Sequence, residues 1–169
     1  KDGLILDVGC GEGILSLILG MTSPNRKVLG IDVSASRLSD ARRAVLGLTR
    51  VKFVNKDIAQ YKFPNCNGIV MSDFLHHIST NLQNDVLIKC HSALSEGGIL
   101  FIKDVDKNAK IRSILSRFWY FILYPKDKIY YRGRKNFEVF LENLGFDVES
   151  LESSPISPFS TIIYKCVKK

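Results

Sequence analysis

Short apolar segments alternate with longer segments of helical periodicity along the chain. Runs rich in Val, Ile, Leu and Phe predict seven strands, at residues 4–8, 27–32, 51–55, 68–72, 98–103, 146–151 and 160–167. Between two of them, apolar residues recur at helical spacing at Leu82, Val86, Cys90 and Ala93. Strands that alternate with helices form a mostly parallel sheet with helices on both faces. The pattern therefore predicts an α/β fold.

The ends of some elements can also be predicted. Ser34 and Ser36 offer N-caps for a helix over 35–46. For the helix that contains Leu82, we expect Thr80 and Gln83 to form a capping box, and we expect the helix to stop at Gly97.

The last predicted strand differs from the others. Its side chains alternate from Thr161 to Cys166, and only the short segment 153–159 separates it from the preceding strand. Two strands joined by a short connection pair as an antiparallel hairpin. We therefore expect the last strand to run antiparallel.

A glycine-rich segment, LDVGCGEG from Leu6 to Gly13, lies at the end of the first strand. Its alternating glycines allow a sharp turn and a close approach of the backbone to a ligand, and the helix-like residues 14–20 follow at once. A dinucleotide fingerprint would need glycine at Ile14, and the Gly-Lys-Ser/Thr of a P-loop is absent. The segment indicates a nucleoside-cofactor loop, with a purely structural turn as the alternative.

Acidic residues stand at or just after the ends of four predicted strands, at Asp7, Asp32, Asp57 and Asp73. Ligands of open α/β sheets bind outside the carboxyl ends of the strands, so these acids point to one shared site. Asp32 lies at roughly the twenty-residue offset of a ribose-binding carboxylate. A helix-capping role is the alternative for Asp32, although Ser34 already offers a cap.

On these residues the chain resembles class I S-adenosylmethionine-dependent methyltransferases of the small-molecule type, similar to quinone-biosynthesis methyltransferases. The segment Asp7–Gly13 matches the first motif of that class, and Asp32 in Gly30–Ser34 matches its ribose acid. The resemblance implies a seven-stranded Rossmann-like methyltransferase sheet with an antiparallel last strand, and S-adenosylmethionine as cofactor. The cofactor-binding residues that it implies are Asp7, Gly9, Cys10, Gly11, Asp32, Val33, Asp57, Ile58, Ser72 and Asp73.

The resemblance also implies roles within that set. Asp57 and Ile58 would flank the adenine, and Ser72 with Asp73 would lie near the methionine part.

Two adjacent histidines, His76 and His77, follow the fourth strand in the string DFLHHI, which resembles the same stretch of many small-molecule methyltransferases. Histidine can accept a proton near neutral pH, as a hydroxyl or enol acceptor would require. Adjacent residues cannot both face one pocket, so we expect one catalytic base and favour His77. A structural role for both, with methyl transfer by proximity alone, is the alternative.

Length and composition indicate a single globular domain. We expect one methyltransferase domain over 1–169, with 104–135 as an acceptor-side or lid insertion and without the helices that relatives carry ahead of the first strand. The four cysteines show no metal-binding or disulfide spacing, which predicts a reduced, cytoplasmic setting and no structural metal. No apolar run reaches the roughly 18 residues of a membrane span.

The excess of positive charge lies in one segment, because residues 103–135 carry 10 basic and 3 acidic side chains. Apolar residues from Ile111 to Leu123 follow helical spacing there. Three interpretations of this helix stay open. Its apolar stripe could pack on the sheet with the basic side chains in solvent, or the segment could help to hold an apolar or lipid-like acceptor. Alternatively, residues 111–131 could lie on an anionic membrane surface. Nucleic acid is a weaker alternative, since Ser72–Leu75 lacks the Asn/Asp-Pro-Pro-aromatic sequence of base methylation.

These observations predict an enzyme that methylates an oxygen or carbon of a small, apolar or lipid-like acceptor. Two alternatives stay open: a non-catalytic scaffold that binds S-adenosylmethionine or S-adenosylhomocysteine, and an RNA methyltransferase.

Overall fold

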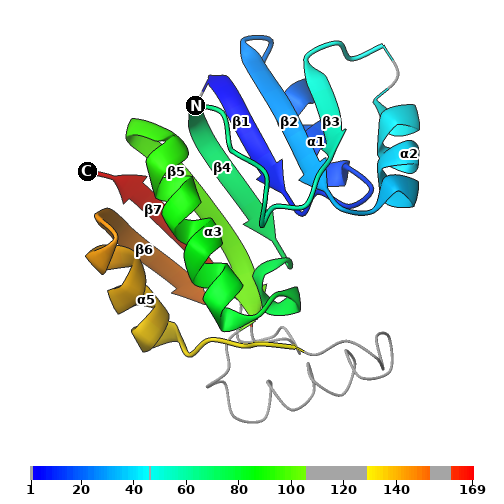
Figure 1. The fold of residues 1–169 in the computed structure, drawn as a ribbon. Helices are drawn as coiled ribbons and strands as arrows, with labels where there is room; N and C mark the ends of the chain where they lie inside the picture. The colour runs from blue at the N-terminus through cyan, green and yellow to red at the C-terminus, as the bar shows by residue number, and fades with distance from the viewer. Residues whose placement is uncertain (1, 46, 106–128, 153–160) are drawn as a thin grey trace.

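A seven-stranded sheet forms the centre of the computed structural model, which describes residues 2–45, 47–105, 129–152 and 161–169 (Figure 1). Its strands are β1 (Gly3–Val8), β2 (Arg26–Asp32), β3 (Val51–Asn55), β4 (Cys66–Ser72), β5 (Leu94–Val105), β6 (Phe146–Glu152) and β7 (Thr161–Lys168). They lie in the order β3-β2-β1-β4-β5-β7-β6. The first five pair in parallel, and β7 is antiparallel to β5 and β6. The predicted fold class and antiparallel last strand are confirmed.

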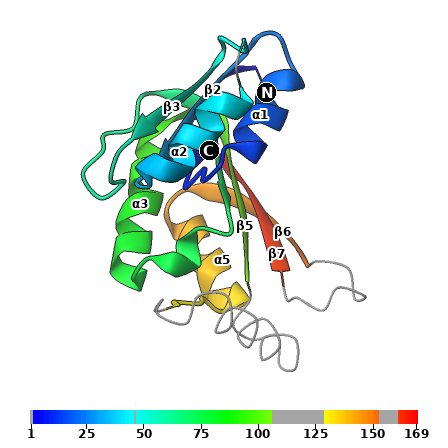
Figure 2. The same cartoon turned by 90° about the vertical axis from the view of Figure 1, so that its right-hand side faces the viewer.

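Helices cover both faces of this sheet. The described helices are α1 (Ile14–Met21), α2 (Ala35–Ala44), α3 (Thr80–Ala93), α5 (Arg134–Asn143) and the 3₁₀ turn η1 (Leu75–His77). Figures 1 and 2 show α3 and α5 on one face and α1 with α2 on the other. The predicted cap of α2 is present, because the Ser34 hydroxyl accepts a hydrogen bond from the amide of Arg37 at 3.4 Å.

Strand β2 shows how the alternation of side chains builds a core on each face. Val28 packs with Leu38 and Phe53 in the smaller cluster, beside α2. Ile31 points the other way and joins the larger cluster with Leu87 of α3 and Leu141 of α5. Because helices cover both apolar faces of the sheet, the middle of each parallel strand carries apolar side chains. The polar side chains of these strands lie at the strand ends.

The structure corrects both predicted ends of α3. Its N-cap is Ser79, whose hydroxyl accepts from the amide of Leu82 at 3.4 Å, so Thr80 and Gln83 form no capping box. The helix ends at Ala93 rather than at Gly97, because the buried Leu94 already pairs with Cys66 as the first residue of β5. The glycine lies in an irregular stretch of β5 and has a φ of +63°.

Several predicted segments lie outside the described residues. They include the helical stripe 111–123, all but the end of the proposed surface segment 111–131, and the connection 153–159. Among the described helices, no one is long and apolar enough to cross a membrane.

A pair of Leu→Ala substitutions tests where the stability of the fold resides. Leu100 in β5 has no exposed surface, whereas Leu151 in β6 is 70% exposed. Leu100→Ala should lower the free energy of unfolding by about 2–5 kcal/mol, and Leu151→Ala by no more than about 0.5 kcal/mol. Urea denaturation of both variants measures the difference. Equal losses would contradict the core assigned to β5.

Candidate functional site

One large cavity lies at the carboxyl ends of the parallel strands, where the arrowheads of β1, β2 and β4 in Figure 1 end at the same edge of the sheet. Its volume of about 730 Å³ falls within the range of small-molecule sites. The structure brings all ten residues of the predicted cofactor set to its wall: Asp7, Gly9, Cys10, Gly11, Asp32, Val33, Asp57, Ile58, Ser72 and Asp73.

The glycine-rich loop after β1 forms one wall of the cavity. Gly9, Gly11 and Gly13 all have positive φ, at 75°, 53° and 75°, where other residues are strained. A Cβ on Gly9 would stand 2.2 Å from the Phe74 ring, so packing alone excludes a side chain there. A Cβ on Gly11 would meet nothing within 4 Å, so the loop leaves open space beside this residue.

Asp32 connects this loop to the end of β2. One carboxylate oxygen accepts from the amide of Gly11 at 2.9 Å, and the other accepts from the amide of Ser34 at 2.8 Å. Only 9% of the residue is exposed. Since each carboxylate oxygen has two lone pairs, Asp32 can still accept bonds from ligand hydroxyls. It is thus a structural link that keeps lone pairs available for a ligand.

Asp7 lies deeper in the same wall and is 2% exposed. Burial raises the pKa of its carboxyl to about 6, partly offset by the hydroxyl of Ser16, which donates to it at 2.6 Å. The nearby charge of Asp32 acts in the same direction as burial. A cationic ligand group next to Asp7 would favour its ionised form. Burial also raises the pKa of the neighbouring Cys10 thiol, which therefore stays protonated at neutral pH.

The remaining predicted positions form the wall beyond β3 and β4. Asp57 accepts from the amide of Ala59 at 2.8 Å in a turn that leaves the apolar Ile58 at the cavity. Asp73 has an unusual φ of +52°, and Lys103 donates to its carboxylate at 2.6 Å. Ser72 also donates to Asp73, at 3.0 Å. Backbone strain of this kind gathers at functional sites.

Sequence reasoning missed other residues of the cavity wall, including Glu12, Arg37 and Phe74. Glu12 in the glycine-rich loop pairs with Arg37 of α2 at 3.5 Å, and both side chains are about half exposed. No sequence spacing marks such a pair, since its partners lie on different elements. Phe74 could have been inferred from its position directly after Asp73.

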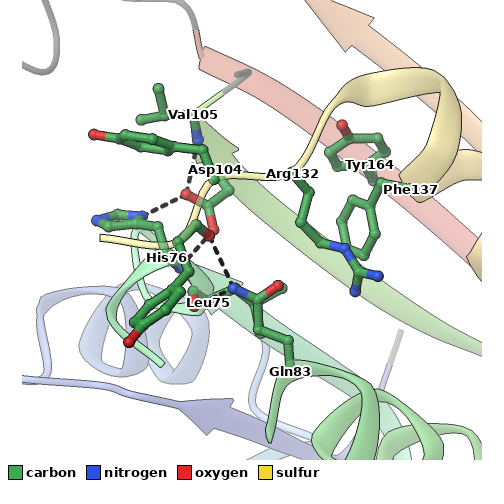
Figure 3. Close-up of a pocket in the computed structure, with 10 residues that line it drawn as sticks. Leu75, His76, Gln83, Asp104, Val105, Arg132, Phe137 and Tyr164 are labelled. Atoms are coloured by element: carbon green, nitrogen blue, oxygen red, sulfur yellow. Dashed lines mark hydrogen bonds and ion pairs between the residues drawn. The ribbon is translucent and has the colours of Figure 1, made fainter. Parts of the chain in front are cut away.

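The two adjacent histidines point to different places. His77 lines the large cavity, whereas His76 is 1% exposed and lies in a second, much smaller cavity (Figure 3). Nδ1 of His76 lies 2.5 Å from a carboxylate oxygen of Asp104, whose other oxygen accepts from the His76 amide at 3.2 Å. The two imidazole rings are 4.3 Å apart. Asp104, at the end of β5, was not anticipated from the sequence.

The fold and this cavity together define an α/β protein that binds a nucleoside-type ligand at the ends of parallel strands. Residues 5–98 match the family model described as "Methyltransferase domain", and the chain belongs to this family. The cofactor expected from the sequence, S-adenosylmethionine, is the cofactor of this family.

Curated relatives of the chain are named as methyltransferases of different kinds. The chain is 27% identical to a ubiquinone biosynthesis O-methyltransferase of Glaesserella parasuis serovar 5 (strain SH0165), over 82% of this chain and 58% of that one. It is 28% identical to a trans-aconitate 2-methyltransferase of Rhodopseudomonas palustris (strain BisA53), over 67% and 43%. The chain thus spans about half the length of the curated relatives it matches.

A solved structure shows the same architecture with a ligand. Magnesium protoporphyrin IX methyltransferase from Synechocystis PCC 6803, with S-adenosylhomocysteine (SAH) bound, superposes with a TM-score of 0.79 at 21% identity, covering 100% of this chain and 75% of that one. At this identity the likeness concerns the fold.

The cavity wall fits S-adenosylmethionine on its own chemistry. Asp32 offers carboxylate lone pairs for ribose hydroxyls, and the buried carboxyl of Asp7 suits a cationic group. Val33 is 73% exposed beside Asp32, and Ile58 lies on the same wall, so a flat adenine would cover apolar surface there.

Replacing Asp32 by Ala should weaken S-adenosylmethionine binding at least about tenfold, because hydrogen bonds to a charged group are lost. Asp40→Ala is the matched control, since Asp40 lies on the exposed side of α2 and pairs with Arg43. Calorimetric titration compares both variants with the parent. An Asp32→Ala protein that binds as tightly as the parent would refute the ribose assignment.

Binding should also depend on pH through Asp7. Its pKa is about 6 without ligand, and a bound cation would lower it, so binding should release protons near pH 6. Affinity should therefore rise as the pH increases from about 5 to about 7 and then level off. Asp7→Asn should flatten this rise. Titrations in buffers of different ionisation enthalpy count the protons, and an equal pH dependence in Asp7→Asn would count against this role.

Proposed function

We propose that the protein transfers the methyl group of S-adenosylmethionine to a hydroxyl oxygen of a small phenol- or enol-type acceptor. The observation that carries this proposal is the buried pair of His76 and Asp104 beside the cofactor cavity. Bound S-adenosylmethionine supplies an electrophilic methyl group. The protein's own residues must orient the acceptor and take its proton.

The type of acceptor follows from the need for a base. A phenol has a pKa near 10 and is protonated at neutral pH, whereas a carboxylic acid has a pKa near 4 and is already ionised. An oriented base would therefore assist a phenol or enol and would add nothing for a carboxylate. The His76–Asp104 pair favours the hydroxyl class over the carboxylate class.

Asp104 supports His76 as the proton acceptor. Its carboxylate holds Nδ1 of the imidazole and so directs Nε2 as the nitrogen that receives the proton. As the acceptor oxygen forms its bond to the methyl carbon and the bond from sulfur to that carbon breaks, the acceptor proton passes to His77, which the sequence favoured and which lines the cofactor cavity. His77 in turn passes a proton to His76, whose ring lies 4.3 Å from its own.

Other residues of the large cavity would position the acceptor. Phe74, Ile78 and Leu82 supply apolar surface on the side next to His77, which suits an apolar ring. Orientation of the two reactants accounts for much of the rate in such transfers. The basic segment 103–135 is the proposed source of further acceptor contacts. A lipid-like acceptor and a membrane contact through 111–131 stay proposals.

The names of the relatives agree with this proposal in part. One is an O-methyltransferase of ubiquinone biosynthesis, and the other acts on trans-aconitate, which is a carboxylic acid. We favour the first type because of the His76–Asp104 pair. We also propose a cytoplasmic location, which the four free cysteines support.

Substitution of His76 distinguishes the two classes of acceptor. With a catechol as acceptor, His76→Asn should lower kcat about 10²–10⁴-fold. Asp104→Asn should lower kcat about tenfold or more. With trans-aconitate, any turnover should be unchanged by His76→Asn. Transfer of radiolabelled methyl groups measures all of these rates.

His91→Gln is the control, since His91 lies on α3 with its ring against Phe146, outside both cavities. It should retain the parental rate. Tight cofactor binding without turnover of any phenol would contradict the proposal and favour a non-catalytic scaffold.

A further inference from the structure

Gln83 stands out among the buried residues of α3. The residues of this helix that face the core are Gln83, Val86, Leu87, Cys90 and Ala93. Gln83 has no exposed surface, and burial of an amide is costly unless its polar atoms are paired. A polar side chain in this apolar stripe therefore needs a reason, and its hydrogen bonds supply one.

The side-chain amide of Gln83 joins the turn η1 to residue 130. Its nitrogen lies within hydrogen-bond distance of three carbonyl oxygens, those of Leu75 at 2.9 Å, Ile78 at 3.1 Å and Tyr130 at 3.0 Å. Because the amide carries two N–H groups, one of them is shared between two of these carbonyls. The first two carbonyls lie at either end of the turn η1, which carries His76 and His77. The amide orientation is fixed, because a flipped amide would place its oxygen against three carbonyl oxygens. One uncharged side chain thus clamps the histidine turn.

Tyr130 connects this clamp to the next part of the chain. Its amide donates to the carbonyl of His76 at 2.9 Å, and its carbonyl accepts from Gln83. The neighbouring Arg132 donates to Asn84 of α3 at 2.9 Å and lies over the rings of Phe137 and Phe140. Residues 130–132, which belong to the basic segment 103–135 proposed to contact the acceptor, are therefore fastened to η1 and α3 together.

Asp104 holds the same turn from the sheet. It binds both the amide and the ring of His76 and also accepts from the amide of Val105 at 2.7 Å. Figure 3 shows the imidazole of His76 directed at Asp104, with the amide of Gln83 close to Leu75. The turn is thus held by β5 on one side and by α3 with residues 130–132 on the other.

We propose that Gln83 is a positioning residue for methyl transfer, which fixes the turn η1 so that His76 keeps its orientation toward Asp104. The inference rests on the proposed function, because it assigns the base to this turn. Gln83 itself lines only the small cavity, which has room for about one water molecule, and does not line the cofactor cavity. Loss of the Gln83 side chain should therefore disturb the orientation of His76 and leave cofactor binding unchanged.

The test compares Gln83→Met, which keeps the size of the side chain but removes its donors, with Val86→Ala, a matched loss one turn further along the same buried stripe. The chain has only 3 histidines, so the nitrogen-15 signals of their imidazoles can be assigned individually. In the parent, His76 should show the tautomer protonated at Nδ1, and the Tyr130 amide should exchange slowly with solvent. Gln83→Met should mix the tautomers of His76 and speed exchange at Tyr130 roughly tenfold.

Val86→Ala should leave both signals as in the parent, and the dissociation constant for SAH should stay within about twofold in both variants. In turnover of a catechol, Gln83→Met should lower kcat roughly ten- to hundredfold with an unchanged KM for S-adenosylmethionine. If Gln83→Met does not fold, Gln83→Asn replaces it, since its shorter amide cannot reach all three carbonyls.

Unchanged His76 and Tyr130 signals in the Gln83 variant, or equal changes in Val86→Ala, would overturn the inference. The spectroscopic arm needs no acceptor. A parent protein that binds SAH but methylates no phenol would therefore count against the proposed function alone, while the His76 signals still decide the role of Gln83.

Discussion

The carboxylate of Asp32 connects the two parts of the chain on which the cofactor site depends. It accepts from the amide of Gly11 in the loop after β1 and from the amide of Ser34 at the start of α2. The loop can reach it only because three alternating glycines adopt positive φ. Since β1 and β2 are parallel neighbours, their ends already lie side by side, and the carboxylate fixes what lies beyond those ends. The link thereby fixes two elements of the cavity wall in place.

The parallel order of the strands also explains why the side chains of the proposed mechanism line two cavities. The ends of β1 and β2 supply Asp7 and Asp32 to the cofactor cavity, whereas the end of β5 supplies Asp104 to the small cavity. The turn η1 after β4 lies between them and gives one histidine to each. In the proposed function, cofactor binding and proton transfer therefore belong to neighbouring groups that can be altered separately.

Much of the fold and of the cofactor wall could be predicted from the sequence. Strand patterns are local, so all seven strands were found, and the acids at their ends converge because parallel strands end at one edge. The boundary between α3 and β5 was placed wrongly, because Leu94 is drawn into the sheet by its pairing with Cys66, which no local signal reveals.

The proton-transfer side was less predictable for the same reason. Asp104 meets His76 from 28 residues away, and Gln83 reaches Tyr130 across 47 residues. A glutamine three residues after a threonine suggested a capping box, but tertiary contacts with three carbonyls gave it another role. Long-range pairs of this kind have no spacing that a sequence could show.

A crystal structure of the protein with SAH bound would show whether Asp32 holds the ribose. We expect the ligand in the cavity at the ends of β1 and β2, with its ribose hydroxyls at roughly 2.6–3.2 Å from the carboxylate of Asp32 and its adenine against Val33 and Ile58. A ligand bound elsewhere, or a ribose without contact to Asp32, would contradict this expectation.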